Sequence, residues 1–577
     1  MVLMSGVYYF DGREAVLRPE PVVSADGRFL LVADARIDNQ SELFGEIGDA
    51  ETILRAYEKW GEGCAERLIG DFAFAVWDRK ERAFFSARDG FGVRPFYYHL
   101  SSDKLIFSSE ITGVLQTPGV PRRLDETTIA SHLLWDTDDQ EATFYRDVKK
   151  LPAAHFLKTL PNGGAAIRRY WSLDPGRELK GKSDAACAEG FRAHFTEAVR
   201  CRLLAPPHGG ARVGCLLSGG LDSSAVTAVA RDLSVPLHTF SAVFDEVPSS
   251  DERPFIEAIT SMEGIQPHFI QAGRIAPFHG IREALRHAGE PSTYELSIFR
   301  QGIYPAAKEA GVGVLLDGDG GDEVVSRGYL RLAELLIGFR WAEYGRTLSA
   351  LSKNLGRSMA DLFISQSLRP LVPPAALRAW RRARWGNRSL WIDRTLFNPA
   401  FARRARLAER EEARIRTETT PARSVKEQHL RELTSGAVSY AFPIIRQAAG
   451  RFGIEHRYPF HDRRLAEYCL SLPSDQKLYR GWTKIVMRRA LEGLLQDAVR
   501  WRGGKTYLAD EFVYRFERFE RGHLERVIVG DPSRIAPYFN VERLRKLYRS
   551  FIVKPSYEFA IILWQAVLLD LWLECMD

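Results

Sequence analysis

The sequence predicts two domains of different class, a strand-rich domain followed by an α/β domain with a parallel sheet. Three observations predict this division. The chain has 577 residues, more than one hydrophobic core usually covers. Residues 7–171 show short apolar or alternating runs between polar turns, which is typical of strands. The remaining sequence alternates apolar strands with helical segments, an order that favours parallel pairing.

The first domain is expected to span residues 1–175. Its clearest strands are RFLLVADARI, DFAFAVWD, RAFFSA and LIFSSE, and helical patterns occur near residues 51–60 and 125–134. The polar stretch SLDPGRELKGK, residues 172–182, contains helix and strand breakers. This stretch is therefore the predicted domain boundary.

The second domain is expected to span residues 180–577. A helix at 184–203 leads into an apolar strand at 213–217, and further strands are expected at 237–244 and 312–318. Two glycine-rich loops follow the first and third of these strands. Because ligands of parallel sheets bind beyond the carboxyl ends of the strands, both loops are candidate binding sites.

Two later segments differ from this alternation. Residues 330–425 have a helical pattern rich in Arg and Trp, and we interpret them as an insertion. The apolar stretch at 559–573 is interrupted by Gln565 and Asp570 and is shorter than the roughly 20 residues that span a bilayer. It is expected to form a buried helix, with no membrane span in the chain.

Composition narrows the class of protein. Hydrophobic residues make up 45% and charged residues 27%, as in ordinary globular proteins. The net charge of +6 is too diffuse to indicate nucleic-acid binding, although it suits an acidic ligand. Six cysteines without a CxxC pair, and a start without a signal-peptide pattern, favour a cytoplasmic protein with reduced thiols and no structural zinc.

The first loop, SGGLDSS at 218–224, joins a strand directly to a helix. Such a junction exposes backbone N–H groups at the positive end of the helix dipole, and this arrangement binds phosphate. Its glycines allow close approach of phosphate oxygens. The loop lacks the lysine of a Walker A sequence. A simple turn with a helix cap is the alternative.

The second loop, DGDGGDE at 317–323, places four carboxylates among glycines. Crowded carboxylates repel one another unless water or a cation separates them. In isolation such a loop is most simply a solvated acidic turn. Beside the first loop, Asp222 and Asp322 become candidate Mg²⁺ ligands that hold the ion against phosphate oxygens.

Residues 180–510 resemble the synthetase domain of the asparagine synthetase family, which is of the ATP-pyrophosphatase type. The resemblance rests on ordered matches: SGGLDSS, Asp251-Glu252, Glu290-Pro291, GDGGDEVVSRGY (318–329), GIEHRYPFHD (453–462), LPSDQK (472–477), and the lysines of TKIVMRRA and RGGK. It implies that a carboxylate attacks the α-phosphate of ATP, that pyrophosphate leaves, and that an amine resolves the acyl-adenylate.

The resemblance also implies roles for individual residues. ATP binding falls to the two loops, at Leu217, Ser218, Gly219, Gly220, Asp222, Ser223, Ser224 and Gly318. Lys484 and Lys505 would neutralise charge on the leaving pyrophosphate and the transition state. Asp319 would steer or deprotonate the attacking amine. Glu455 is a second candidate for that role, or a structural partner of Arg457.

The first domain resembles the glutaminase domain of class II amidotransferases, which implies an Ntn-hydrolase-like αββα sandwich. The matches are RLIGDFAFAVWD, ARDGFGVRPFYY, FSSEI and LPAAH. Those enzymes use an N-terminal cysteine as the nucleophile. Here Ser5 stands in its place behind four residues, and Asp34-Ala35 replace the Asn-Gly pair of the oxyanion hole. We therefore expect a degenerate, inactive glutaminase domain.

An inactive glutaminase domain implies that the amine comes from elsewhere. Lasso-peptide macrolactam synthetases and β-lactam-type synthetases combine such a domain with an intact synthetase domain. Asp319, where β-lactam-forming relatives have Tyr, argues against the latter. The DGDGGDE form of the loop and the Arg- and Trp-rich insertion, which could hold a peptide or could be a helical lid with solvated arginines, favour the former. The leading hypothesis is a lasso cyclase that uses ATP, Mg²⁺ and a precursor peptide, with a leader protease and a leader-binding protein as partners. The alternatives are an ammonia-dependent asparagine synthetase, a β-lactam-type synthetase acting on a small amino acid, and an inactive nucleotide-binding scaffold.

Overall fold

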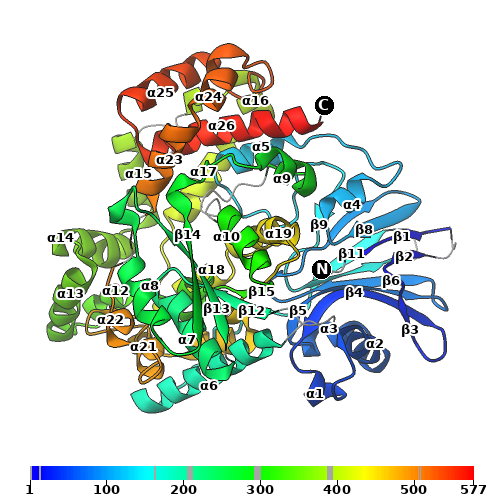
Figure 1. The fold of residues 1–577 in the computed structure, drawn as a ribbon, viewed down its shortest axis with the longest axis horizontal. Coiled ribbons are helices and arrows are strands. Elements are labelled where there is room, and N and C mark those ends of the chain that lie inside the picture. Colours follow the sequence, from blue (N-terminus) through cyan, green and yellow to red (C-terminus); the bar gives the residue numbers. More distant parts are fainter. Residues whose placement is uncertain are drawn as a thin grey trace. The chain divides into compact units, whose positions relative to one another are not determined.

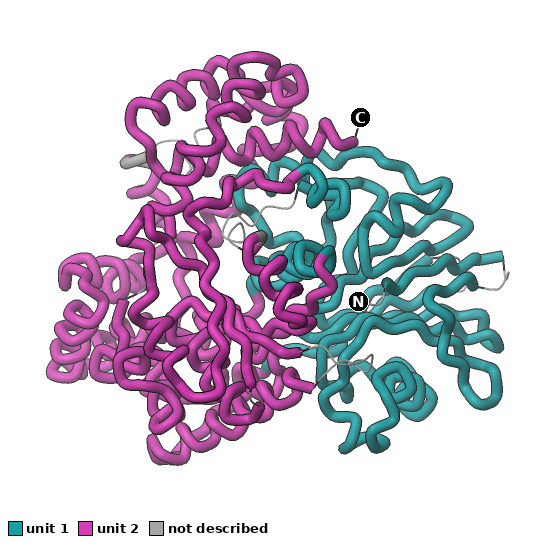
Figure 2. Tube along the Cα trace, in the orientation of Figure 1, with its two compact units in different colours: residues 1–173, 282–293, 435–451 teal, residues 174–281, 294–434, 452–577 magenta. Residues whose placement is uncertain are grey.

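A computed structural model gives the fold of most of the chain. It describes residues 3–11, 15–160, 164–204, 212–234, 236–291, 300–385, 394–504, 506 and 508–576. The chain forms two compact units, each assembled from segments distant in sequence (Figure 2). Unit 1 comprises Met1–Leu173, Arg282–Thr293 and Ser435–Arg451. Unit 2 comprises Asp174–Ile281, Tyr294–Thr434 and Phe452–Asp577.

Unit 1 contains two antiparallel sheets (Figure 1). The first has the strand order β2-β1-β8-β7-β9 and the second the order β11-β10-β6-β5-β4-β3. The strands are β1 (Ser5–Tyr9), β2 (Val16–Arg18), β3 (Val22–Val23), β4 (Phe29–Ile37), β5 (Gly70–Asp78), β6 (Ala83–Arg88), β7 (Tyr97–Leu100), β8 (Lys104–Ser108), β9 (Lys149–Lys150), β10 (His155–Thr159) and β11 (Ala165–Arg169).

Both faces of strand β5 are buried, and they belong to different cores. Ala73, Ala75 and Trp77 join the core that also contains residues of β1, β7 and β8. The alternate residues Phe74 and Val76 join a second core with residues of helix α2. Side chains of a strand point alternately to its two faces, so one core lies between the sheets and the other beneath a helix.

Helices cover the outer faces of these sheets, with α2 against β4 and α4 against β7 and β8. The αββα sandwich expected for an Ntn-hydrolase-like domain is thus confirmed. The helices of unit 1 are α1 (Gln40–Leu43), α2 (Asp49–Trp60), α3 (Cys64–Arg67), α4 (Ile111–Leu115), α5 (Glu126–Leu133), α9 (Ile281–Ala288) and α19 (Gly436–Gly450). The last two come from the later sequence, which the sequence pattern gave no reason to expect.

Unit 2 is built on a parallel sheet of five strands with the order β14-β13-β12-β15-β16. The strands are β12 (Arg212–Leu216), β13 (Leu237–Val243), β14 (Ile265–Gln271), β15 (Val312–Leu316) and β16 (Glu455–Arg457). The three predicted strands correspond to β12, β13 and β15. The edge strands β14 and β16 were not predicted, because β14 is partly exposed with polar residues and β16 has only three residues.

Helices α7, α8 and α10 pack against this sheet. The helices of unit 2 outside the insertion are α6 (Asp184–Leu203), α7 (Leu221–Leu233), α8 (Arg253–Thr260), α10 (Arg300–Glu309), α11 (Gly321–Val325), α18 (Val425–Leu433), α20 (Arg463–Ser471), α21 (Ile485–Ala490), α22 (Asp497–Arg500), α23 (Ala509–Phe519), α24 (Arg521–Leu524), α25 (Val541–Val553) and α26 (Tyr557–Met576). A short hairpin joins β17 (Leu478–Tyr479) to β18 (Trp482–Thr483).

The expected insertion is helical. It contains α12 (Arg331–Ile337), α13 (Trp341–Leu355), α14 (Met359–Leu362), the π-helix η5 (Phe363–Leu368), the 3₁₀ turn η6 (Arg369–Leu371), α15 (Pro374–Trp385), α16 (Pro399–Arg404) and α17 (Leu407–Glu418). Leucines of α12, α13 and α14 share a buried core with Leu478. The insertion therefore packs on the hairpin that precedes α21.

The cysteines and the apolar C-terminal helix can be compared with the expectations from the sequence. None of the six cysteines, all of which lie in the described part of the chain, forms a disulfide bond, and five of them are buried. Among the described residues, one helix, α26, has the length and apolar composition of a membrane span, and 72% of its apolar window is buried inside the protein.

Candidate functional site

The first glycine-rich loop joins the end of β12 to the start of α7. Gly219 has a φ of +74°, and a Cβ there would lie 3.0 Å from the Cβ of Phe255, so this position requires glycine. Gly220 caps the helix without a side-chain hydrogen bond. The first N–H groups of α7 therefore remain available to an anion at the positive end of the helix.

The serines of this loop form a local hydrogen-bond network. The backbone N–H of Ser218 donates to the Ser223 hydroxyl at 3.1 Å, and the two hydroxyls lie 3.0 Å apart. Ser224 and Leu217 are buried beneath the loop, where the N–H of Leu217 donates to Phe240 at 3.0 Å. These contacts hold the hydroxyls of Ser218 and Ser223 in the loop, where phosphate oxygens would be bound.

The second loop, between β15 and α11, interlocks with the first. A Cβ on Gly318 would lie 2.6 Å from the backbone nitrogen of Ser223, and a Cβ on Gly321 would lie 2.4 Å from the carboxyl carbon of Asp222. Substitution of either glycine would force the loops apart. The two loops predicted to share one edge of the sheet are therefore in direct contact.

Asp222 and Asp322 meet at Lys484. The Lys484 ammonium lies 2.6 and 2.7 Å from the carboxylate oxygens of Asp222 and 2.6 Å from Asp322. Asp322 also accepts a hydrogen bond from Arg327 at 3.1 Å. Lys484 has a φ of +51°, a strained conformation that is common at functional sites. The geometry brings together three of the predicted residues, although they are up to 262 positions apart in sequence.

This donor set suits Mg²⁺. Two carboxylates converge on one cation, and Mg²⁺ favours oxygen ligands, usually a few carboxylates completed by water and phosphate. Among the described residues, no group of three or more His, Cys, Asp or Glu side chains has metal-site geometry. A metal ion held here would therefore depend on phosphate oxygens and water as well as on Asp222 and Asp322.

The predicted amine-handling residue, Asp319, lies beside a buried charged cluster. Its carboxylate accepts a hydrogen bond from Arg300 at 2.8 Å, and Arg300 also lies 3.1 Å from Asp317. Burial and the negative charge of Asp317 raise the pKa of Asp319, although Arg300 opposes this shift. Burial alone would also raise the pKa of Asp317, but Arg300 and His456 lower it overall. The two carboxyl groups thus differ in proton affinity.

Glu455, the second candidate for this role, is paired with Arg457 at 3.0 Å. Arg457 also donates to the carbonyl oxygens of Arg202 and Leu204 at the end of α6. Glu455 aligns with Val314, well before the loop that follows β15. Glu455 therefore has the contacts expected of a structural partner of Arg457, which was the alternative to a role in handling the amine. Lys505, the other predicted lysine, lies outside the described residues.

Sequence reasoning missed two arginines of this region. Arg300 at the start of α10 carries no motif that would have identified it, and only the fold brings it to Asp319. Arg502 donates to the carbonyl oxygen of Gly219 at 3.0 Å and forms an ion pair with Glu252. Arg502 is the first residue of the RGGK motif, three positions before Lys505, and this was a signal that the interpretation did not use.

Unit 1 differs at the positions where a glutaminase would have its active site. Ser5 lies within β1, paired with Ser108, and its nitrogen is bonded to Met4. Met4 is fully buried and exchanges hydrogen bonds with Ser109. The Ser5 nitrogen is thus an amide of a packed strand and not a free amine. Asp34 forms ion pairs with Arg446 and, at 3.6 Å, with Arg94.

Comparison with models of protein families shows the family to which this chain belongs. The model of the family described as asparagine synthase matches residues 190–574, and that of the glutamine amidotransferase domain matches residues 19–171. The chain belongs to the asparagine synthase family. The second match begins after Ser5, so it does not include the position of the missing nucleophile.

Curated relatives are similar to this chain over about half of its length or more. Asparagine synthetase [glutamine-hydrolyzing] 3 of Bacillus subtilis is 27% identical over 80% of this chain and 71% of its own length. Asparagine synthetase [glutamine-hydrolyzing] 2 of the same organism is 24% identical over 83% and 62%. Amidase chyE of Penicillium rubens is 27% identical over 48% and 43%. This chain thus spans less than two thirds of the second and third relatives.

Asparagine synthase-family proteins form amide bonds at the expense of ATP, and the site described above has the groups for that chemistry. The two loops offer N–H and hydroxyl donors, while Asp222, Asp322 and Lys484 provide two acidic ligands and one cation. Unit 1 retains the fold of the glutamine amidotransferase domain, but it has Ser5 where a cysteine is expected and Asp34-Ala35 where an Asn-Gly pair is expected.

Proposed function

We propose that this protein adenylates a carboxylate of a peptide and joins it to an amine of the same peptide, closing a macrolactam ring as lasso-peptide cyclases do. The observation that carries the adenylation step is the convergence of Asp222, Asp322 and Lys484 beside a helix N-terminus. A phosphate chain needs this combination of backbone donors, a cation and metal-binding carboxylates.

In the first step, a carboxylate oxygen of the peptide forms a bond to the α-phosphorus of ATP, and the bond to the β-phosphate oxygen breaks. The loop at Ser218–Ser223 holds phosphate oxygens through its N–H and hydroxyl groups. Lys484 stabilises the negative charge that grows on the departing pyrophosphate. Mg²⁺ held by Asp222 and Asp322 neutralises charge on the phosphates when it is bound.

In the second step, the amine attacks the acyl carbon, the bond to AMP breaks, and the amine loses one proton. We assign acceptance of that proton to Asp319, which lies in the second of the two loops. The raised pKa of Asp319 makes its carboxylate a better base than an ordinary aspartate. Arg300 orients this carboxylate through the hydrogen bond at 2.8 Å.

The contacts of unit 1 support an amine that comes from the substrate. A glutaminase would need a free α-amine on its nucleophile and an oxyanion hole. Ser5 lies in a paired strand, and Asp34 is occupied by ion pairs with Arg94 and Arg446. The proposed partners are a precursor peptide, a protein that presents its leader segment, and a protease that frees its N-terminal amine.

The test is to incubate the full chain with ATP, Mg²⁺ and a synthetic peptide that has a free N-terminus and an internal Asp or Glu. We expect AMP and pyrophosphate in equal amounts, and a product whose mass is lower by one water. The matched peptide with Asn or Gln at the acidic position should give neither. ADP as the product would contradict adenylation. A linear adenylated peptide without ring closure would contradict the proposal that the peptide's own amine attacks the acyl-adenylate.

A second function is favoured by the names of the relatives. Two of them are glutamine-hydrolysing asparagine synthetases, so a small amino acid is the competing substrate. Free aspartate with ammonium would then support AMP formation, whereas the peptide would not. An inactive scaffold would bind ATP and release neither AMP nor ADP.

A further inference from the structure

The helical insertion contains a cavity of about 570 Å³ that none of the steps above uses. Its lining includes apolar side chains, among them Ile364, Leu368, Leu377 and Trp380, and two arginines, Arg369 and Arg381. A mainly apolar cavity with a few polar groups, of roughly 300–1,000 Å³, is typical of a ligand site.

The apolar side chains of this pocket are unusually open to solvent. Ile364 is 58% exposed, Leu368 is 43% exposed and Trp380 is 61% exposed. Scattered apolar residues are normal on a surface, but a group that lines one cavity indicates a binding surface. Tryptophan and arginine are also the residues that most often dominate binding energy at interfaces.

One wall of the pocket is a π-helix, a rare structure that is frequently found at functional sites. The π-helix η5 supplies Ile364 and Leu368 to the lining. Ser367, on the same segment, is buried, and its hydroxyl oxygen accepts a hydrogen bond from the Tyr344 hydroxyl at 3.0 Å. This contact fixes the wall to α13, so the exposed leucine and isoleucine are presented on an anchored segment.

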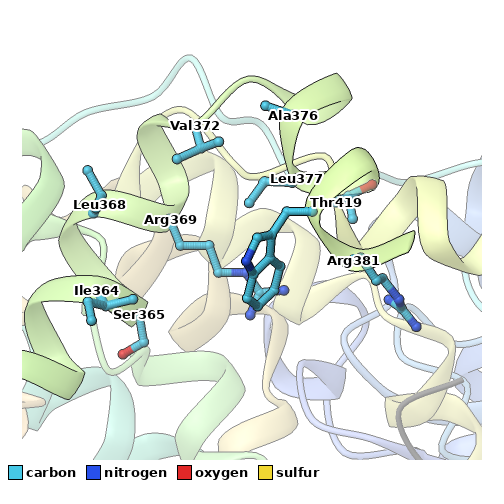
Figure 3. A pocket seen from close by; sticks show the side chains of 10 residues that line it. Ile364, Ser365, Leu368, Arg369, Val372, Ala376, Leu377, Arg381 and Thr419 are labelled. Atoms are coloured by element: carbon cyan, nitrogen blue, oxygen red, sulfur yellow. The ribbon is translucent and has the colours of Figure 1, made fainter. Parts of the chain in front are cut away.

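The pocket lies in the most basic part of the chain. Residues 330–425 contain 19 Lys and Arg and 8 Asp and Glu, while the whole chain has a net charge of only +6. Arg381 is paired with Glu418 at 2.5 Å. Arg369 forms no ion pair with any residue that the structure describes, and Figure 3 shows it extending between Ile364 and Leu368 on one side and Arg381 on the other.

We infer that this pocket binds an acidic segment of the peptide substrate, with one large apolar side chain in the cavity and a neighbouring carboxylate on Arg369. The inference rests on the proposed function and extends it to a second contact, made by residues other than those assigned to the reaction. The Arg369 guanidinium selects the carboxylate, because an arginine at an apolar surface binds carboxylates strongly. The net positive charge of the insertion steers an acidic peptide toward it.

The experiment is fluorescence anisotropy with the full chain and a short fluorescein-labelled peptide that has one Trp between Glu residues. Two matched peptides replace the Trp by Ser or the Glu residues by Gln. We expect the first peptide to bind, and both replacements to weaken binding by about tenfold or more. Leu368→Asp and Arg369→Glu should weaken binding of the first peptide to a similar extent.

The control variant is Val553→Asp, which places the same charge on an exposed valine of α25, and it should bind like the wild type. Leu368 and Arg369 are exposed, so unfolding is not expected, and circular dichroism checks this. Unchanged affinity in both pocket variants, or no binding by the wild type, would overturn the inference. Dimerisation that Leu368→Asp abolishes would also overturn it, because a second copy would then cover the pocket.

AMP release separates this inference from the proposed function. If the peptide binds and the pocket variants lose it, the inference stands whether or not AMP forms. Missing AMP with every peptide contradicts the proposed function alone. With a cyclisable peptide, pocket variants should raise KM and leave kcat within about twofold, as expected for a contact equally strong in ground and transition states.

Discussion

Unit 1 and unit 2 both have buried ionic groups where a glutamine-dependent synthetase would have its active sites, but the groups are arranged differently. In unit 1, Asp34 is balanced by Arg94 and Arg446. In unit 2, Lys484 is shared by two carboxylates, and neighbouring loops present free helix N–H groups. Although Arg327 also pairs with Asp322, the two carboxylates of unit 2 converge on one ammonium beside these N–H groups, an arrangement that can bind a metal ion and phosphate. In unit 1 a single carboxylate already has two arginine partners, and such a cluster can stabilise a fold.

The largest effect is expected from the shared carboxylates of unit 2. Asp222→Asn and Asp322→Asn should each lower the rate of AMP formation by roughly 10³-fold, because each removes electrostatic stabilisation of the phosphate chain and its metal ion. The assay is single-turnover release of AMP. The matched control is Asp232→Asn, an exposed aspartate on the same helix as Asp222, which should keep full activity. Near-normal turnover in both site variants would remove unit 2 as the active unit.

The ion pair of unit 1 should matter for stability instead. Among the residues that the structure describes, Arg446→Met leaves Asp34 the longer contact to Arg94, and loss of one partner of a buried pair costs roughly 3–5 kcal/mol. Urea unfolding would measure the loss. Arg451→Met, which breaks a pair with the exposed Glu283, should cost about 0–1 kcal/mol. Equal stability of the two variants would mean that the Asp34 pair does not stabilise unit 1.

A smaller effect concerns the pH dependence of unit 2. Burial lowers the pKa of Lys477 to about 8, and its ammonium contacts His429 at 2.8 Å, with Cys469, Lys426, Glu334 and Glu432 as the other nearby ionisable groups. The unfolded chain has a lysine pKa of about 10.4. Between these values the unfolded state binds more protons, so the contribution of Lys477 becomes more favourable as the pH rises.

Lys477→Met lacks this contribution, so its stability relative to the wild type should fall as the pH rises from about 8 to 10.4, by at most about 1.4 kcal/mol per pH unit. Thermal unfolding at pH 7.5 and 9.5 provides the comparison. Lys554→Met, at an exposed lysine, should show a constant difference from the wild type. A constant difference for Lys477→Met as well would mean that Lys477 keeps an ordinary pKa.

The smallest effect is expected at Ser5 of unit 1. Ser5→Ala should leave AMP formation within about twofold of the wild type, and glutamine should not replace the substrate amine, since Ser5 has no free α-amine. Ammonium supplied in place of glutamine serves as the comparison. Glutamine-dependent turnover that disappears in Ser5→Ala would show that both units are catalytic, and the contrast between them would be lost.

Local sequence was sufficient to predict the two loops as candidate binding sites, because a glycine-rich junction between an apolar strand and a helix is typical of anion binding. It also predicted β12, β13 and β15, whose apolar runs are continuous. The meeting of Asp222 with Lys484 was implied only by resemblance to a family, since 262 residues separate them. Arg300 was not predictable in this way, because its contact with Asp319 depends on the packing of α10 and leaves no local pattern.

The membership of α19 in unit 1 has a consequence for synthesis on the ribosome. Arg446 lies 412 residues after Asp34, and at about 5–20 residues per second this interval takes roughly 20–80 s. During that time Asp34 in the nascent unit 1 lacks Arg446, the nearer of its two arginine partners. Unit 1 also lacks helix α19, which belongs to it in the folded protein. We expect the first domain to finish folding only after most of the second has emerged, so that it depends on chaperones more than its position at the start of the chain suggests.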